Sequence, residues 1–373
     1  MLVAALCLLA APSLLEREIP QGDLHLYPFK SEDGTLAGEA KATAPPKVTS
    51  DHIELKVGES AEAIECALVR GRIEPASRVF HIMEALKKEK ITLTEAGLVD
   101  VSVVSEAPLL TIDVLYSYGA ALGELKVAML SSSGLSFVCT QDTAGYRSTF
   151  RTVVQSLANT VHDPTRDIRP RKYHQIEVVK SDGAPVGVYE TVVQEADGGL
   201  EERRFRTLIV PSGPGVVRTK EAESRQFERD GSVEDGGYSV GVNDVWSEAQ
   251  LSRAKDGRYT IKGKHDGKPF ENALPAPDGI ATENLVQRTS RAVLAKKIES
   301  RKFQTFEVEK PDSLLTFTLR RDPSRPSALV MEGAAAPPIT LEMDPSSRAK
   351  SSSENMGAHR LTTETLFVSG SLP

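Results

Sequence analysis

The chain has 373 residues and a formal net charge of −7, and 40% of its residues are hydrophobic and 26% charged. At about 150 residues per domain, this length predicts two or three domains. The surplus of acidic residues argues against a general nucleic-acid or anionic-membrane binder, because such proteins gather Lys and Arg on one face. We therefore expect no nucleic-acid partner.

The first fifteen residues are uncharged and mostly apolar (MLVAALCLLAAPSLL). A run of this length, with the small residues Ala10, Ala11 and Ser13 behind it, is typical of a secretory signal and is short for a membrane span. The alternative is a buried N-terminal helix, since no Lys or Arg precedes Arg17. We expect an exported protein, periplasmic or extracellular, with no transmembrane span in its mature chain.

Residues 16–50 are polar and rich in Pro and Gly, which predicts an irregular tether. A strand at 53–57 and a helix at 74–90 follow, and Val79, Ile82, Met83 and Leu86 form an apolar helical stripe. Turn residues then separate four runs typical of antiparallel strands, and residues 144–160 return to a helical period. The pattern predicts an α+β domain over 51–162, a helix–antiparallel sheet–helix sandwich. The four strands are expected at 98–105, 109–118, 124–131 and 135–141.

This succession resembles the Mog1/PsbP/DcrB group of proteins. The resemblance rests on the last strand, residues 134–140 (GLSFVCT), and on the closing helix, residues 146–157 (YRSTFRTVVQSL). It implies a binding or accessory module without a common catalytic residue.

A basic, proline-punctuated segment at 163–172 predicts a linker. Repeated Asp-Gly pairs then divide β-leaning runs, which is typical of hairpin turns in a long antiparallel meander over 173–373. A helix is expected at 282–300, and the serine-rich segment 346–355 is expected to be mobile. The charged run Glu201, Glu202, Arg203, Arg204 is interpreted as a solvated strand face.

Such a curved antiparallel sheet with one internal helix resembles the open β-barrel of the LolA/LolB lipoprotein carriers. The resemblance rests on residues 173–178 and 185–189 at its start and 339–344 near its end. It implies a concave apolar face able to hold a lipid tail or a partner's strand. The ligand-lining residues expected there are Val193, Ile209, Trp246 and Phe306.

Outside the apolar N-terminal run, the chain has two cysteines, Cys66 and Cys139. In an exported chain such a pair predicts a disulfide. The alternative is two buried thiols, because both cysteines lie in apolar stretches.

One string has the form of a serine-hydrolase nucleophile elbow, Gly237-Tyr-Ser239-Val-Gly241. That motif works between an entering apolar strand and a leaving helix, whereas the preceding residues here are polar and turn-like. The seven histidines show no paired spacing typical of a zinc site. We expect no catalytic residue, metal or cofactor.

These observations predict an exported, non-enzymatic binding or envelope-accessory protein, with an apolar ligand such as a lipid or acyl chain, or an envelope protein, as its partner. Two alternatives are kept. One is a serine hydrolase that uses Ser239, and the other is a structural protein–protein interaction module whose sheet edge pairs with a partner.

Overall fold

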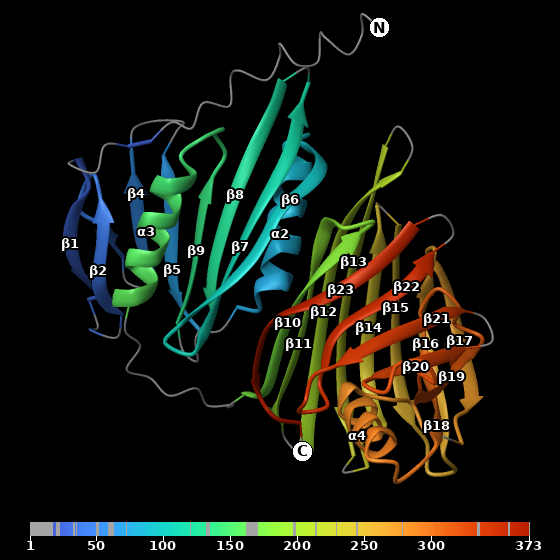
Figure 1. Cartoon of the computed structure of the whole chain (residues 1–373). Coiled ribbons are helices and arrows are strands. Elements are labelled where there is room, and N and C mark those ends of the chain that lie inside the picture. The colour runs from blue at the N-terminus through green and yellow to red at the C-terminus, as the bar shows by residue number, and fades with distance from the viewer. Residues whose placement is uncertain are drawn as a thin grey trace, which may run out of the picture. The chain divides into compact units, whose positions relative to one another are not determined.

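The computed structural model of the chain is dominated by antiparallel strands (Figure 1). The expected leader, residues 1–15, lies outside the described residues, as does most of the expected linker. The chain forms two units, the first made of Met1–Pro75 and Glu84–Asp167 and the second of Ala76–Met83 and Ile168–Pro373. The structure describes residues 18–372 apart from 20–22, 33, 35, 50–51, 59–62, 72, 120, 132–134, 162–170, 197–198, 213–214, 229, 244, 278, 334–335 and 357–358.

The first unit contains a seven-stranded antiparallel sheet with the order β3-β4-β5-β9-β8-β7-β6. Its four C-terminal strands match the expected meander, although β6 begins earlier than predicted. A separate hairpin of β1 (His25–Lys30) and β2 (Ala37–Ala42) belongs to the same unit. The sheet strands are β3 (Lys47–Val48), β4 (His52–Val57), β5 (Ile64–Arg70), β6 (Thr92–Val104), β7 (Ala107–Tyr118), β8 (Ala121–Ser131) and β9 (Leu135–Gln141).

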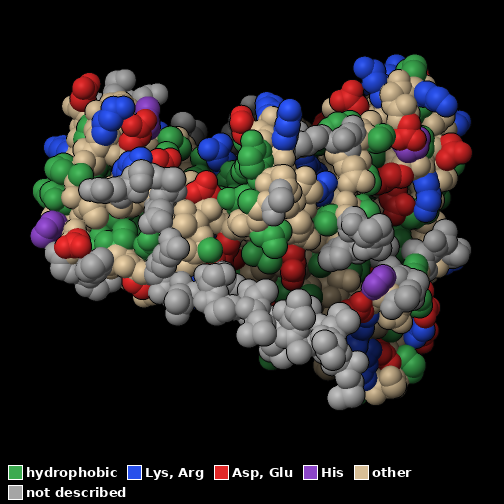
Figure 2. All heavy atoms as spheres, turned by 90° about the horizontal axis from the view of Figure 1, so that it is seen from above, with side chains coloured by type: hydrophobic (Ala, Val, Ile, Leu, Met, Phe, Trp, Pro, Cys, Tyr) green, Lys and Arg blue, Asp and Glu red, His purple; other side chains and the backbone are tan. Residues whose placement is uncertain are grey.

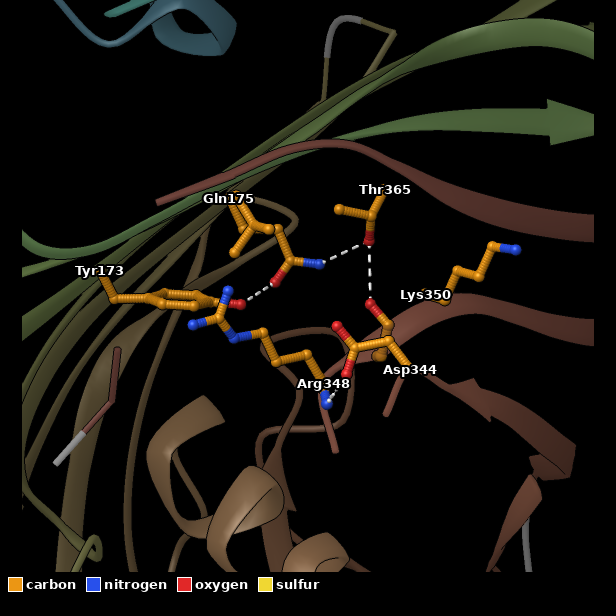
Figure 3. Close-up of a pocket in the computed structure, with 8 residues that line it drawn as sticks. Tyr173, Gln175, Asp344, Arg348, Lys350 and Thr365 are labelled. Atoms are coloured by element: carbon orange, nitrogen blue, oxygen red, sulfur yellow. Dashed lines mark hydrogen bonds between the residues drawn. The ribbon is translucent and has the colours of Figure 1, made fainter. Parts of the chain in front are cut away.

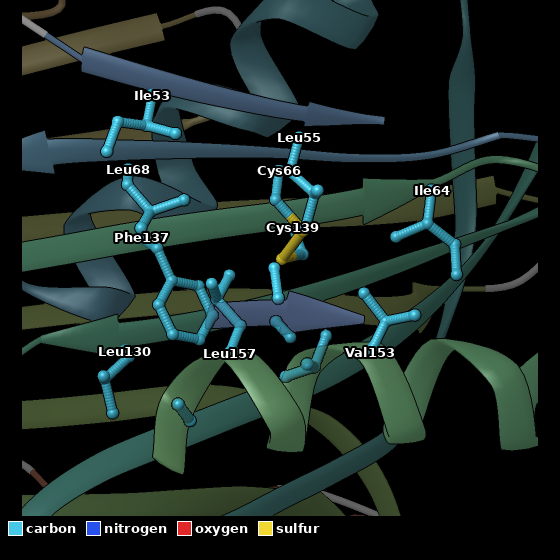
Figure 4. Close-up of a cluster of buried hydrophobic side chains, with 14 of the residues drawn as sticks. Ile53, Leu55, Ile64, Cys66, Leu68, Leu130, Phe137, Cys139, Val153 and Leu157 are labelled. Atoms are coloured by element: carbon cyan, nitrogen blue, oxygen red, sulfur yellow. A yellow bond between two sulfur atoms is a disulfide. The ribbon is translucent and has the colours of Figure 1, made fainter. Parts of the chain in front are cut away.

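The core of this unit is apolar (Figure 4). Helix α3 (Arg147–Thr160) places Phe150, Val153 and Leu157 against the sheet, because these residues recur at helical spacing. Cys66 and Cys139 are directly opposite on β5 and β9 and form a disulfide within this core. The structure therefore shows the predicted disulfide and not two buried thiols.

The expected tether and the expected sandwich are both wrong. Residues 16–50 contain β1 and β2, and Leu36, Ala40 and Ala42 of this segment are buried in the core. The fold is mainly β, not an α+β helix–sheet–helix sandwich. A 14-residue helix spans about 21 Å, whereas strands of 12 or 13 residues span about 40 Å, so α3 covers only part of this sheet.

Helix α2 (Pro75–Lys88) also departs from the sandwich. Residues Ala76–Met83 belong to the second unit, and the N–H of Ala76 donates to Glu190 Oε2 at 2.8 Å. On the predicted apolar stripe Val79 is buried, whereas Ile82 and Leu86 are only half-buried. The stripe is therefore not the core face of the first sheet.

The second unit is a single antiparallel sheet of fourteen strands that curves around helix α4 (Glu283–Leu294) (Figure 1). Eight strands follow in chain order, β10 to β17, and six more follow the helix, β18 to β23. The two runs join where the first strand of one, β10, pairs with the last strand of the other, β23.

The bounds of these strands follow the predicted meander closely at its Asp-Gly turns. Asp182-Gly183 and Asp266-Gly267 both have positive φ, as two-residue hairpin turns require. The strands are β10 (Arg171–Ser181), β11 (Ala184–Ala196), β12 (Gly199–Ser212), β13 (Gly215–Phe227), β14 (Val233–Val242), β15 (Val245–Arg253), β16 (Arg258–His265), β17 (Lys268–Pro275), β18 (Ser300–Phe306), β19 (Leu314–Arg321), β20 (Ala328–Gly333), β21 (Ala336–Met343), β22 (Ala349–Met356) and β23 (His359–Gly370).

Two local predictions in this unit are wrong. Helix α4 ends at Leu294, and Lys296 has a φ of 58°, so the chain has left the helix well before residue 300. The serine-rich segment forms β22, where Ser351, Ser352 and Ser353 pair with β23. Among the described residues, no helix is long and apolar enough to cross a membrane.

Candidate functional site

The sheet of the second unit has an inner face, defined here as the face on which α4 packs. Tyr173 on β10 lies on it, because its hydroxyl accepts a hydrogen bond from Gln287 of α4 at 2.9 Å. Residues directly opposite on antiparallel strands share a face, so the strand register extends this assignment across the sheet.

The register separates the four predicted ligand-lining residues. Val193 lies opposite Tyr173 and Phe306 packs against Tyr238, so both are on the inner face, and both are buried. Ile209 and Trp246 are on the outer face. Trp246 is 42% exposed there, with the Lys220 ammonium 5.8 Å from its ring. The structure therefore does not bring the four together around one cavity.

The inner face instead carries a ladder of opposite charges on β12 and β13. Glu202, Arg204 and Arg206 on β12 lie directly opposite Arg225, Glu223 and Glu221 on β13. The ion pairs Glu202–Arg225 and Arg204–Glu223 each measure 3.5 Å, and Arg206 contacts Glu221. The solvated-face interpretation of this segment is wrong for Glu202, which has no exposed surface.

The charge ladder changes from buried to accessible along its length. Glu202 and Arg225 are buried, whereas the Arg206 side chain keeps 39% of its surface exposed. Burial raises the pKa of Glu202 to about 8 in spite of Arg225. Burial also raises the pKa of Glu223, but Arg225, Arg204 and Arg206 outweigh it and hold that pKa below its usual value. The inner face near Arg206 is therefore charged and partly exposed.

The buried end of the ladder anchors the start of α4. Glu202 Oε2 accepts the N–H of Glu283 at 2.7 Å, and Arg225 donates to the carbonyl of Ala281 at 3.2 Å. Thr282 caps the helix by accepting the N–H of Leu285 at 3.3 Å. The helix is held by polar contacts at the end where its backbone N–H groups lack partners of their own.

Next to α4 the inner face forms a polar pocket (Figure 3). Tyr173 and Gln175 come from β10, Thr365 and Val368 from β23, and the other lining residues from β22 and the turn before it. The Arg348 guanidinium lies beside Tyr173, whereas the Lys350 ammonium points away. The lining residues are Tyr173, Gln175, Asp344, Arg348, Ala349, Lys350, Thr365 and Val368.

A chain of hydrogen bonds crosses this pocket, and each group donates to the next. Gln287 Nε2 donates to Tyr173 at 2.9 Å, and the Tyr173 hydroxyl donates to Gln175. Gln175 Nε2 donates to Thr365 at 3.0 Å, and Thr365 donates to the carbonyl of Ala349 at 2.9 Å. The last acceptor is a backbone carbonyl, so the chain of donors runs from α4 toward β22.

Further along β10, Glu177 continues the polar inner face. It accepts a hydrogen bond from Thr363 at 3.2 Å. Burial, and secondly the charge of Glu283, raise the pKa of Glu177 to about 7. The same two causes, in the same order, raise the pKa of the Tyr173 hydroxyl. Tyr173 therefore acts as a neutral hydroxyl near neutral pH.

The serine and histidine candidates do not meet. Ser239 lies inside β14 with strand on both sides, so it is not on a strand–turn–helix elbow. His265 contacts Ser247 at 3.1 Å and Asp266 at 3.7 Å instead. His174 is buried and pairs with Glu190 at 2.8 Å on the outer face. Among the described residues no group of three side chains is placed to hold a metal ion.

On the face that Figure 2 presents, the described residues form no large patch of a single charge. Figure 2 shows Lys and Arg side chains interspersed with Asp and Glu over the face it presents. Such mixing agrees with the modest net charge of −7.

Sequence reasoning missed the ladder and the pocket for different reasons. The ladder had a readable signal, because charges alternate with period two in Glu202-x-Arg204-x-Arg206 and in Glu221-x-Glu223-x-Arg225, and complementary alternation predicts cross-strand pairs. The pocket had none, because it depends on the pairing of β10 with β23.

The chain matches no family model and no curated protein. Among solved structures it is similar to a β-barrel-like protein of a domain of unknown function, DUF1849, from Brucella abortus. The sequence identity is 9% and the TM-score 0.40, over 52% of this chain and 96% of that one. The resemblances to the Mog1/PsbP/DcrB group and to the LolA/LolB carriers stay predictions.

Proposed function

We propose that this chain is an exported, non-enzymatic binding protein whose second unit holds a small polar ligand with a single negative charge. The ligand occupies the pocket beside Tyr173, and its anionic group pairs with Arg348.

The observation that carries this proposal is the convergence of polar groups at that pocket. Two strands and one turn contribute a phenol, an amide, a hydroxyl, a carboxylate and a guanidinium to its lining. A guanidinium suits recognition of a carboxylate or phosphate oxygen. Asp344 already accepts the N–H of Arg348 at 2.9 Å, and its charge disfavours a multiply charged anion.

An acyl chain fits this inner face less well. The face carries the charge ladder and Glu177, and burying apolar ligand atoms against charged groups strips those groups of water at a high cost. The apolar clusters of this unit are already packed. The two larger ones lie against β14–β18 and against α4 itself, and two smaller ones lie around Tyr173 and around Val179.

Export is supported by the disulfide together with the apolar N-terminal run. Disulfides persist in oxidising compartments and are rare in the cytosol of most organisms. N-terminal sequencing of the protein from its native cell tests this part. A mature chain that begins between residues 11 and 17 is expected, and an intact Met1 in the cytosol would contradict export.

Binding is tested by calorimetry and thermal shift with a small monoanion, pentanoate. Arg348→Ala should weaken binding at least tenfold, since it removes the charge-assisted hydrogen bonds. Arg258→Ala is the matched control, because Arg258 also donates to a backbone carbonyl, at 2.8 Å, but outside the pocket. Equal affinities for the two variants would reject this pocket.

A further inference from the structure

The hydrogen-bond chain that crosses the pocket begins with an acceptor that has no donor. Gln287 uses its Nε2 for Tyr173, and its Oε1 has no partner among the described residues although the side chain is only 2% exposed. One turn earlier on α4, the Oδ1 of Asn284 is also buried and without a partner. Leaving a buried acceptor unpaired is energetically unfavourable, so two together need an explanation.

Three carboxylates near the start of α4 are also acceptors, those of Glu283, Glu177 and Glu202. Glu283 is four residues before Gln287 and therefore on the same side of α4. Its charge is close enough to raise the pKa of both Glu177 and Glu202. Glu202 is already bound to Arg225 and to the N–H of Glu283, whereas Glu177 has one hydrogen bond, from Thr363.

The arginine side chains around these acceptors already bind other groups. Arg204 pairs with Glu223 at 3.5 Å, and Arg225 pairs with Glu202 and Glu223. Arg348 donates to the carbonyl of Gly370 at 2.8 Å, on the pocket side of Tyr173. The positive end of the α4 dipole opposes a further cation, but its first N–H groups are already bound by Glu202 and Thr282.

We propose that the ligand of this site also carries a primary ammonium group, which donates to Glu177, to Gln287 Oε1 and to Asn284 Oδ1. This inference rests on the proposed function, because it places the ligand's anionic end at Arg348. An ammonium group has three donors and no acceptor, which matches a cluster composed of acceptors. The ligand class is therefore a small zwitterion of the amino-acid kind.

The pocket that holds the anionic end is a short distance from Glu177 along β10. Gln175, which lines the pocket, and Glu177 are alternate residues of β10 and share the inner face, so they are about 7 Å apart along the strand. A linear ω-amino acid with three to five methylene groups spans such a distance. The chain length that binds best then measures the separation of the two ends.

The test compares pentanoate, 5-aminopentanoate and pentylamine by calorimetry at pH 7.5, together with the amino acids one methylene shorter and longer. We expect 5-aminopentanoate or a neighbour in the series to bind at least tenfold more tightly than pentanoate. Glu177→Gln should abolish that advantage, so that 5-aminopentanoate binds no more tightly than pentanoate does to the same variant. Glu354→Gln is the control, because Glu354 is an inner-face carboxylate near Arg206.

The outcomes separate the two proposals. If pentanoate binds through Arg348 and the amino acids bind no more tightly, the ammonium site is rejected and the anion pocket remains. If none of the compounds binds, the proposed function fails as well. Gln287→Leu provides a second variant, and retention of the full amino-group advantage in both Gln287→Leu and Glu177→Gln would also overturn the inference.

Discussion

The two units bury their helices in opposite ways. Helix α3 of the first unit turns Phe150, Val153, Val154, Leu157 and Ala158 into an apolar core. Helix α4 of the second unit buries Asn284, Gln287, Thr289 and Ser290 beside Leu285 and Val293.

An apolar face contributes stability through area removed from water, whereas a buried polar face contributes little net stability and specifies particular partners. The same architectural element therefore covers an apolar core in one unit and presents buried polar groups to the inner face of the sheet in the other. Trp246 is the single tryptophan of the chain and lies in the second unit, so its emission reports on that unit alone.

The largest expected effect concerns the disulfide of the first unit. Replacing Cys66 and Cys139 by Ala should lower the free energy of unfolding of that unit by about 4 kcal/mol, because the bond closes a separation of 73 residues. Hydrogen exchange measured by mass spectrometry should show lost protection in β5 and β9. The control is the unfolding transition of the second unit, monitored by Trp246 emission, which should not change. An equal shift of that transition would show that the two units unfold together and would contradict this prediction.

The apolar face of α3 gives the next effect. Leu157→Ala should destabilise the first unit by about 3 kcal/mol, through lost burial and the cavity left behind. Gln287→Leu at the polar face of α4 should change the stability of the second unit by less than about 1 kcal/mol, because it also removes an unpaired acceptor. Equal destabilisation by both would erase the contrast between the helices.

The second unit should lose stability as the pH rises. Glu177 and Glu202 have folded pKa values of about 7 and about 8, above the unfolded value of 4.5, because burial disfavours their charged forms. The stability that the two protonated carboxyl groups contribute is fully present below about pH 4.5. It is lost as the pH rises through 7 and 8. We expect the free energy of unfolding of the second unit to fall by about 1–3 kcal/mol from pH 5 to pH 9. Urea unfolding monitored by Trp246 emission measures this change.

Glu177→Gln removes one of these groups and should flatten that pH dependence. The first unit lacks a carboxylate with such a large shift among its described residues, so its exchange protection should show no matching trend. A pH profile that is identical in wild type and Glu177→Gln contradicts the assignment.

The smallest effect concerns how each helix begins. Thr282→Ala should cost the second unit about 1 kcal/mol, because the Thr282 side chain caps α4. Helix α3 has no such cap; Glu18 accepts the N–H groups of Ser148 and Thr149 instead, at 3.0 and 2.6 Å. Because Glu18 supplies this contact, Glu18→Ala is the matched variant and should cost the first unit a similar amount in thermal unfolding.

Periodicity made the strands and the two longer amphipathic helices predictable. The runs that became β7, β8 and β9 alternate or are wholly apolar, and helix α3 keeps the 3.6-residue period. Segments whose order comes from contacts remote in sequence were missed. Residues 16–50 look polar, yet Leu36 and Ala40 are buried, and Glu18 is held by Thr149 from 131 residues away.

The sequence-based prediction of the ligand-lining residues failed for a related reason. Hydrophobicity alone assigned Ile209 and Trp246 to the cavity, but a strand places alternate residues on opposite faces, and only the register shows which face is inner. The register across β10 and β23 is absent from local sequence. The polar residues that meet there, such as Gln175 and Thr365, are 190 positions apart.

The pairing of β10 with β23 also governs how the second unit folds. As the chain emerges, β10 meets β11 across a two-residue turn, but its other edge stays open until the strand 190 residues later has arrived. Contacts this remote must overcome a large loop-closure entropy, which predicts slow folding and a long-lived open sheet edge. An open sheet edge can pair with other chains and cause aggregation. A chaperone that shields this edge, or rapid completion of the chain through β23, should therefore matter most for this unit.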